Sequence, residues 1–319
     1  MLFGVAEDHD SNPIKMGLGK LKERGVKVIG VNPVRTGYNA VADEWVGIRP
    51  GTDGLFVGAL IHELFRTQQI DLDYLRRYTN AAWLVIDAPG TADNGLFARG
   101  EDGEKLVWCN TAQGFESSKN ADADAALTGP RTLPDGRRAR PVFELMAERY
   151  LGDEYAPETV AAETGLGADD MRRIAAELAH VAFKEEIVLD QPWTDWAGRK
   201  HDKMIGRPVS MHAMRGISAH SNGFQTCRAL HILQILLGSV EVPGGFRFKP
   251  PYPKPFTAHP KPHAVAVPGK PLGGPHLGFV HGPDDLAIDD DGTPLRIDKA
   301  FSWDHPMSSH GLMHMVISN

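Results

Sequence analysis

A strand, a helix and a second strand open this chain, and polar turn residues follow the second strand. The apolar runs 1–6 (MLFGVA) and 28–31 (VIGV) predict two buried strands, and residues 17–24 predict a helix between them. The turn 32–36 (NPVRT) comes directly after the second strand. Parallel α/β sheets bind ligands at the carboxyl ends of their strands. The pattern therefore predicts a nucleotide-type site, although the usual glycine fingerprint for a dinucleotide is missing.

The composition limits the class of protein. The 319 residues are 42% hydrophobic and 24% charged, as in a globular protein with one large core or two ordinary ones. A net charge of −7 argues against nucleic acid or an anionic membrane surface as the main partner. No apolar run approaches the roughly 20 residues of a membrane-spanning helix. Two cysteines are too few for a disulfide framework or a structural zinc site.

The alternation of strands and helices continues to about residue 246. Helices are predicted at 54–65, 71–78, 141–150, 168–181 and 226–237, and strands at 83–86, 105–108, 187–189 and 209–214. We expect the strand 187–189 to be buried and the polar segments 120–124 and 130–140 to be exposed. The predicted fold is α/β, with a doubly wound, mostly parallel sheet. Residues 1–246 form one predicted domain, and the Pro/Gly/His-rich residues 247–319 form a loop-rich partial domain that returns to an incomplete neighbour.

Both ends of the chain are apolar. Met1 opens directly into a predicted strand, and residues 311–319 stop inside an apolar run. Chain termini normally lie in polar, frayed segments. We therefore expect an internal fragment of a longer polypeptide that is inactive alone, and the missing signal sequence says little about compartment.

Several segments, in the same order, resemble the molybdopterin oxidoreductases of the dimethyl-sulfoxide-reductase superfamily. They are the turns 32–36 and 50–53 (PGTD), the segment 155–179, the loop 216–223 (GISAHSNG) and the helix and glycine-rich ending 226–245. In that family the two turns hold the guanosine end of a molybdopterin guanine dinucleotide, and the loop runs beneath the metal. The resemblance covers residues 1–246 and implies a Rossmann-like lobe that binds this cofactor.

The resemblance implies roles for individual residues. Arg35 can bind a phosphate, Asp53 can accept two hydrogen bonds from a guanine edge, and Asn32 can reach a ribose hydroxyl. A structural alternative stays open at two places, because Thr52 with Asp53 could simply cap the next helix, and so could Asn12. The implied cofactor-binding residues are Gly4, Asn12, Asn32, Pro33, Arg35, Thr36, Gly51, Thr52, Asp53, Gly216, Ser218, Ser221 and Gly223.

Two residues, one in the loop 216–223 and one directly before it, are candidates for catalysis. His220 can donate a hydrogen bond near the metal or move the protons that accompany oxygen-atom transfer. Arg215 can bind an anionic substrate such as sulfite. The alternatives are a helix-capping or buried structural role for His220 and a surface salt bridge for Arg215. We do not expect Cys109 or Cys227 to bind molybdenum, because the family's ligand comes from a region upstream of this chain. The histidines between 259 and 314 have irregular spacing, and no metal site is expected there.

Within the superfamily, the runs 6–15 and 212–224 resemble membrane-associated sulfite dehydrogenases. This implies oxidation of sulfite, a small anionic sulfur substrate, by molybdenum in a bis-molybdopterin guanine dinucleotide. It also implies a 4Fe-4S cluster in an amino-terminal part outside this chain, a ferredoxin-like iron–sulfur subunit, and a quinone-reactive membrane anchor that holds the enzyme at the cytoplasmic side. Two alternatives stay open: a tetrathionate, thiosulfate or polysulfide reductase of the same superfamily, and a non-catalytic nucleotide-binding α/β module.

Overall fold

The computed structural model describes residues 1–4, 14–35, 37–213 and 215–246. They all belong to one compact unit, Met1–Pro250, and the second unit, Pro251–Asn319, lies outside the described residues. The described part contains both helices and short strands, four of which form a parallel sheet, and this confirms the predicted α/β class; the doubly wound arrangement stays a prediction. None of the described helices is long and apolar enough to cross a membrane. The predicted domain boundary after residue 246 stays a prediction.

A four-stranded parallel sheet carries the amino-terminal part of the chain. Its strands lie in the order β13 (His212–Ala213), β1 (Leu2–Phe3), β2 (Ile29–Val31) and β3 (Glu44–Val46). Helix α1 (Ile14–Glu23) connects β1 to β2, and α2 (Tyr38–Val41) connects β2 to β3. Strands β2 and β3 lie on one side of β1, and β13, the last of the four in the sequence, lies on the other side. The strand order therefore reverses at β1. All four carboxyl ends point to one edge of the sheet.

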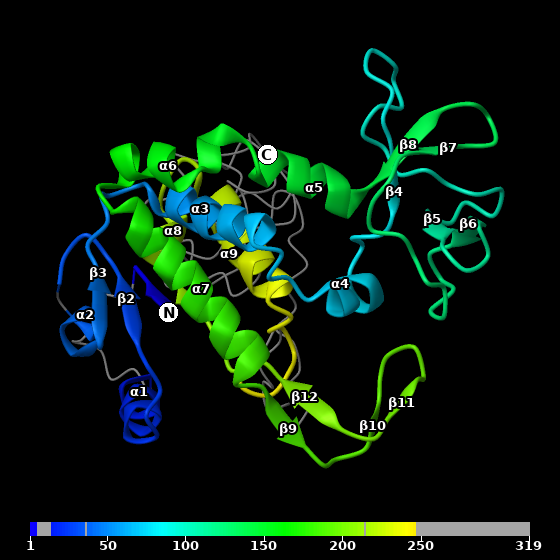
Figure 1. The fold of residues 1–319 in the computed structure, drawn as a ribbon. Coiled ribbons are helices and arrows are strands. Elements are labelled where there is room, and N and C mark those ends of the chain that lie inside the picture. The colour runs from blue at the N-terminus through cyan, green and yellow to red at the C-terminus, as the bar shows by residue number, and fades with distance from the viewer. Residues whose placement is uncertain (5–13, 36, 214, 247–319) are drawn as a thin grey trace, which may run out of the picture. The chain divides into compact units, whose positions relative to one another are not determined.

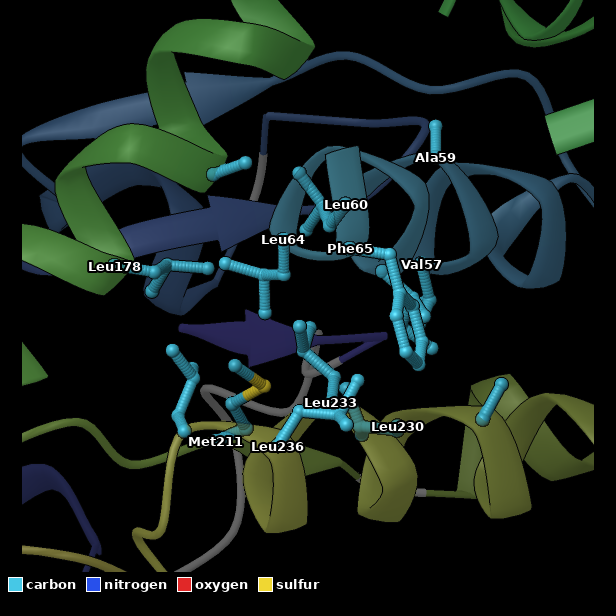
Figure 2. Close-up of a cluster of buried hydrophobic side chains, with 14 of the residues drawn as sticks. Val57, Ala59, Leu60, Leu64, Phe65, Leu178, Met211, Leu230, Leu233 and Leu236 are labelled. Carbon is cyan, nitrogen blue, oxygen red and sulfur yellow. The ribbon is translucent and has the colours of Figure 1, made fainter. Parts of the chain in front are cut away.

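The main core forms around α3 (Asp53–Arg66), in which 11 of 14 residues are buried. A helix that is apolar all round belongs in an interior. It packs against α9 (Gly223–Leu236) and α7 (Ala168–Lys184), and also against α6 (Pro157–Thr164) and α5 (Val142–Tyr150) (Figure 1). Figure 2 shows Leu60 and Leu64 of α3 facing Leu233 and Leu236 of α9, all four fully buried.

The predicted helices are confirmed, and their ends fall within three residues of the predicted positions. Helix α4 (Leu72–Tyr78) is one of them, and the Asp71 side chain caps it by accepting the Tyr74 N–H at 2.9 Å. Asp169 and Asp170 lie in the first turn of α7, where the helix dipole favours carboxylates. A short 3₁₀ helix (Asp153–Tyr155) leads into α6, and α8 (Arg215–Ser218) precedes α9.

Residues 84–141 contain antiparallel strands. Strands β4 (Leu84–Ile86), β8 (Arg138–Pro141) and β7 (Arg131–Thr132) form one sheet, and β5 (Leu106–Cys109) pairs with β6 (Gly114–Ser117). The prediction that 130–140 is exposed was wrong in part, because Leu133 and Ala139 are buried in this small sheet. The charged residues of β8 hide its alternating burial, in which every second residue faces inward.

The prediction of a buried strand at 187–189 was also wrong. Strand β9 (Ile187–Leu189) pairs antiparallel with β12 (Met204–Gly206), and Val188 is 47% exposed. Strands β10 (Trp193–Thr194) and β11 (Lys200–His201) continue the same ribbon (Figure 1). A run of three apolar residues does not distinguish a central parallel strand from an exposed ribbon.

Candidate functional site

Two glycines far apart in the sequence meet at the carboxyl end of β1. Gly4 has a φ of +59°, and its N–H donates to the carbonyl of Val31 at 3.1 Å. A Cβ atom on Gly4 would lie 3.2 Å from the Ile217 nitrogen, and one on Gly216 would lie 3.1 Å from the Gly4 oxygen. Glycine at both positions therefore lets the end of β1 touch the backbone of α8.

The turn before α3 approaches the same loop. Gly51 has a φ of +82°, and a Cβ atom there would lie 3.9 Å from His220 Nδ1. Thr52 occupies the N-cap position of α3, but its hydroxyl donates to the Arg49 carbonyl at 2.8 Å and makes no cap hydrogen bond. The side chain of Thr52 therefore stabilises the turn and does not satisfy an N–H of the helix.

Asp53 and His220 form the most polar part of this contact. The Asp53 side chain lies in the first turn of α3, and the residue is only 7% exposed. Burial raises the pKa of the Asp53 carboxyl, while its own backbone N–H and the nearby His220 oppose that shift. His220 is exposed, and the N-cap of α9 is Asn222. The two structural alternatives for His220, a buried polar group and a helix cap, are therefore wrong.

Helices α3 and α9 touch at their first turns through residues that the sequence did not single out. A Cβ atom on Gly54 would lie 2.8 Å from Thr226 Oγ1. Thr226 is buried, and its hydroxyl donates to the Asn222 carbonyl at 3.2 Å. A Cβ atom on Gly223 would collide with the Ser218 carbonyl, so α9 also begins directly against α8. Gly54 lies inside a predicted helix, where the backbone does not require a glycine. Such a glycine is the signal that could have indicated a close contact there.

The turn after β2 lies next along the same edge. The Asn32 N–H donates to the Val46 carbonyl at 3.2 Å, and its side-chain oxygen accepts the Val34 N–H at 3.5 Å. The Trp45 indole N–H donates to the Asn32 carbonyl at 2.9 Å. Arg35 is exposed, and within the described ranges it makes no ion pair. Trp45, which sequence reasoning missed, thus fixes the backbone of a predicted cofactor residue.

The structure brings together most of the predicted site residues whose positions it describes. Gly4 meets Gly216, the turn 50–53 meets His220, and the turn 32–35 adjoins Gly4 through Val31. Ser218 and Ser221 are exposed, as is Pro33, whereas Gly223 is buried. Asn12, Thr36 and the Arg215 side chain lie outside the described residues.

No metal-binding cluster occurs in the part of the chain that the structure describes: no three His, Cys, Asp or Glu side chains there could share an ion. Cys109 is buried and Cys227 is half-buried, and burial raises the pKa of the Cys227 thiol.

Similarity to known proteins shows the class of protein to which this chain belongs. The chain belongs to the molybdopterin oxidoreductase superfamily, which confirms the resemblance seen in the motifs. At 48% identity, a sulfite dehydrogenase subunit from Allochromatium vinosum matches 100% of this chain, which spans 34% of that protein's length. No family model matches the sequence.

Two more distant relatives are oxidoreductases of other kinds. The formate dehydrogenase major subunit from Haemophilus influenzae is 28% identical over 70% of this chain and 19% of its own length. A putative dimethyl sulfoxide reductase catalytic subunit from Halobacterium salinarum is 32% identical over 50% of this chain and 19% of its own length. The chain thus corresponds to a fifth to a third of each relative.

Proposed function

We propose that this chain is the nucleotide-binding lobe of the catalytic subunit of a molybdenum-dependent sulfite dehydrogenase. The reaction would convert sulfite and water into sulfate, two protons and two electrons. Support comes from the 48% identity to the sulfite dehydrogenase subunit over the whole chain. The cofactor proposed is bis-molybdopterin guanine dinucleotide, with molybdenum as the reacting metal.

The observation that carries the proposal is the meeting of three predicted cofactor segments at one sheet edge. The strand order reverses at β1, and Gly4, at its end, touches Gly216 of α8. In a doubly wound, Rossmann-like sheet, that reversal is where a ligand crevice opens.

The residues at this edge fit the guanosine end of such a cofactor. Asp53 is a buried acceptor whose carboxylate can receive two hydrogen bonds from a guanine edge. Arg35 is an exposed cation whose planar guanidinium matches a phosphate. Gly51 carries no Cβ atom and has open space on that side as far as His220 Nδ1 at 3.9 Å, so a ligand can approach the main chain of this turn closely.

The bound cofactor would supply two-electron oxygen-atom transfer, and the residues of this chain would position it and handle protons. His220 is exposed beside Gly51, so its imidazole can take up or release a proton at the mouth of the site. The buried Asp53 would orient the nucleotide and exclude water from that contact. Arg215 stays a candidate for binding the sulfite anion.

The remaining parts of the enzyme would lie outside this chain. We place a 4Fe-4S cluster in the two-thirds of the polypeptide that the chain does not cover. The proposed electron acceptors are a ferredoxin-like iron–sulfur subunit, followed by a quinone-reactive membrane anchor. The Allochromatium vinosum relative is named as one subunit of its enzyme, which supports an assembly of several chains. The proposed location is the cytoplasmic face of the membrane, through these partners.

The test is to purify the complete polypeptide from a host that makes the cofactor and to measure molybdenum, iron, released guanine nucleotide and sulfite oxidation. We expect about one molybdenum per polypeptide and sulfite-dependent electron transfer. Asp53→Asn should lower molybdenum occupancy, since losing a hydrogen-bonded charge weakens binding by about 10- to 150-fold. Asp73→Asn, at an exposed carboxylate of α4, is the matched control and should change nothing. Protein without molybdenum from a competent host would refute the proposal.

A further inference from the structure

Trp45 is a large aromatic residue that the edge strand β3 leaves 38% exposed, while Val46 beside it is buried. Its register partner on β2 is Gly30. Its indole N–H donates to the carbonyl of Asn32, which lies two residues beyond Gly30 in the direction of the carboxyl end of β2. The side chain therefore leans toward the carboxyl edge of the sheet, where the predicted cofactor turn 32–36 begins.

The ring is held in one position. The hydrogen bond from Trp45 Nε1 to the Asn32 carbonyl is 2.9 Å long. A Cβ atom on Gly47 would lie 2.8 Å from Trp45 Cη2 and 2.9 Å from Cζ2, and the three atoms nearest to it all belong to that ring. Gly47 is exposed and its φ is not in the left-handed region, so room for the indole is the physical reason for a glycine there. The six-membered part of the ring therefore lies beside Gly47, and the residue stays more than a third exposed.

Such a ring has the properties of a nucleotide-binding wall. Every purine presents a flat π face, and stacking on an aromatic side chain is favourable whatever the base. A ring that is already fixed loses little conformational entropy when a ligand binds. A cation for phosphate, Arg35, lies three residues beyond the carbonyl that anchors the ring.

We propose that the open face of the Trp45 indole stacks on the purine of the bound nucleotide, so that Trp45 is a binding residue of the site. This inference rests on the proposed function, which supplies the nucleotide. It adds a contact to the face of the base, in addition to the edge contact assigned to Asp53 and the phosphate contact assigned to Arg35. The alternative is that Trp45 only locks the Asn32 backbone.

The test uses the complete polypeptide made in a host that cannot synthesise molybdopterin, labelled with 5-fluorotryptophan. The Trp45 fluorine signal is assigned by its loss in Trp45→Phe, and the protein is titrated with guanosine monophosphate and, separately, with ribose 5-phosphate. Guanosine monophosphate should shift the Trp45 signal through the ring current of the purine, and ribose 5-phosphate should not. The signal of Trp196, exposed on the ribbon, should stay unchanged with both ligands.

Affinity measurements complete the test. Trp45→Ala should weaken guanosine monophosphate binding by about 5- to 150-fold, as expected for the loss of one base–aromatic stack, and Trp45→Phe should weaken it less. Trp196→Ala is the matched control and should bind as the unaltered protein does. If Trp45→Ala binds guanosine monophosphate as tightly as the unaltered protein, and the Trp45 signal of the unaltered protein does not move on binding, Trp45 has only the structural role. That result would overturn this inference while the proposed function stands. If the unaltered protein binds no guanosine monophosphate, the nucleotide site itself is refuted, and the inference with it.

Discussion

The contact between Gly54 and Thr226 tests directly whether two segments of the site are held together by their helices. Asp53 begins α3 and His220 lies just before α9, so the packing of the first turns of these helices sets the distance between the two side chains. Gly54→Ala adds a single methyl group at that contact. The φ of Gly54 is not in the left-handed region, so the alanine itself introduces no backbone strain.

The structure gives the expected size and sign of the effect. The added methyl would lie 2.8 Å from Thr226 Oγ1, and overpacking of this kind costs about 1–3 kcal/mol. Replacing glycine by alanine in a helix returns about 1 kcal/mol. We therefore expect Gly54→Ala to lower the free energy of unfolding by up to about 2 kcal/mol. In a Thr226→Ala background the nearest atoms are the Cβ of residue 226 and Asn222 Nδ2, both at 3.7 Å, which is ordinary contact. There the same substitution should be neutral or stabilising.

The assay is a double-mutant cycle in denaturant unfolding, with Gly54→Ala, Thr226→Ala and the double variant. A coupling energy of at least about 1 kcal/mol is expected, because the two residues touch. Thr226→Ala alone should cost about 1–2 kcal/mol, through the lost hydroxyl bond and methyl contact. If Gly54→Ala has the same effect in both backgrounds, the first turns of α3 and α9 do not meet as described, and the explanation for the position of His220 fails.

Three further predictions concern backbone strain and titrating groups. Gly4→Ala should cost about 1–2 kcal/mol more than Gly25→Ala in chemical unfolding, because both glycines have positive φ but only Gly4 has backbone packed against it; equal costs would contradict the contact with α8. The pKa of Asp195 lies well below its usual range because, although burial favours the protonated form, hydrogen bonds from Arg199 and His201 favour the carboxylate. Its stabilising effect should therefore be complete above a pH of about 4 and decrease below it, and Asp195→Asn should remove that dependence from hydrogen exchange of the ribbon amides; an unchanged profile would refute this. The pKa of Asp53 is raised by burial, so the folded protein binds that proton more tightly than the unfolded chain, and stability should fall as pH rises from about 4 through the folded pKa. Asp53→Asn should then make the cofactor-free protein more stable at neutral pH, and a lower unfolding midpoint would contradict the assignment.

Local patterns were sufficient to predict six of the helices (α1, α3, α4, α5, α7 and α9) and three of the four strands of the parallel sheet, whereas β3 was missed. The helix α7 has a strong apolar stripe and two aspartates in its first turn, and both features are local. The turn 32–36 directly follows a predicted strand and the turn 50–53 directly precedes a predicted helix, so each turn can be placed at the end of a predicted element. Two segments of the site could therefore be found before the structure was known.

The contacts that unite the site could not be predicted, because they depend on tertiary packing. Trp45 lies in β3, which was not predicted from the sequence, and only the structure shows its indole bonded to Asn32. Thr226 lies in an apolar helix pattern, and its role depends on the absence of a Cβ atom at Gly54. The prediction of a buried strand at 187–189 was wrong because strand pairing is also a tertiary contact. These apolar residues form their hydrogen bonds with β12 and not with a buried sheet.

Two residues at the carboxyl edge, Asp53 and Trp45, are placed unfavourably for folding alone. Asp53 is a carboxylate that burial disfavours, and Trp45 is a large aromatic residue left partly in water. The other buried carboxylates of the described residues are paired, Glu63 with Arg66 and Asp195 with Arg199. Local departures from stable packing are expected where a protein binds a ligand, because the ligand completes the contacts that the chain leaves open. A nucleotide would offer a donor edge to Asp53 and a π face to Trp45, and a ligand that binds only the folded state adds its binding free energy to stability. The cost of this edge to the cofactor-free protein and its affinity for the cofactor therefore have the same physical origin.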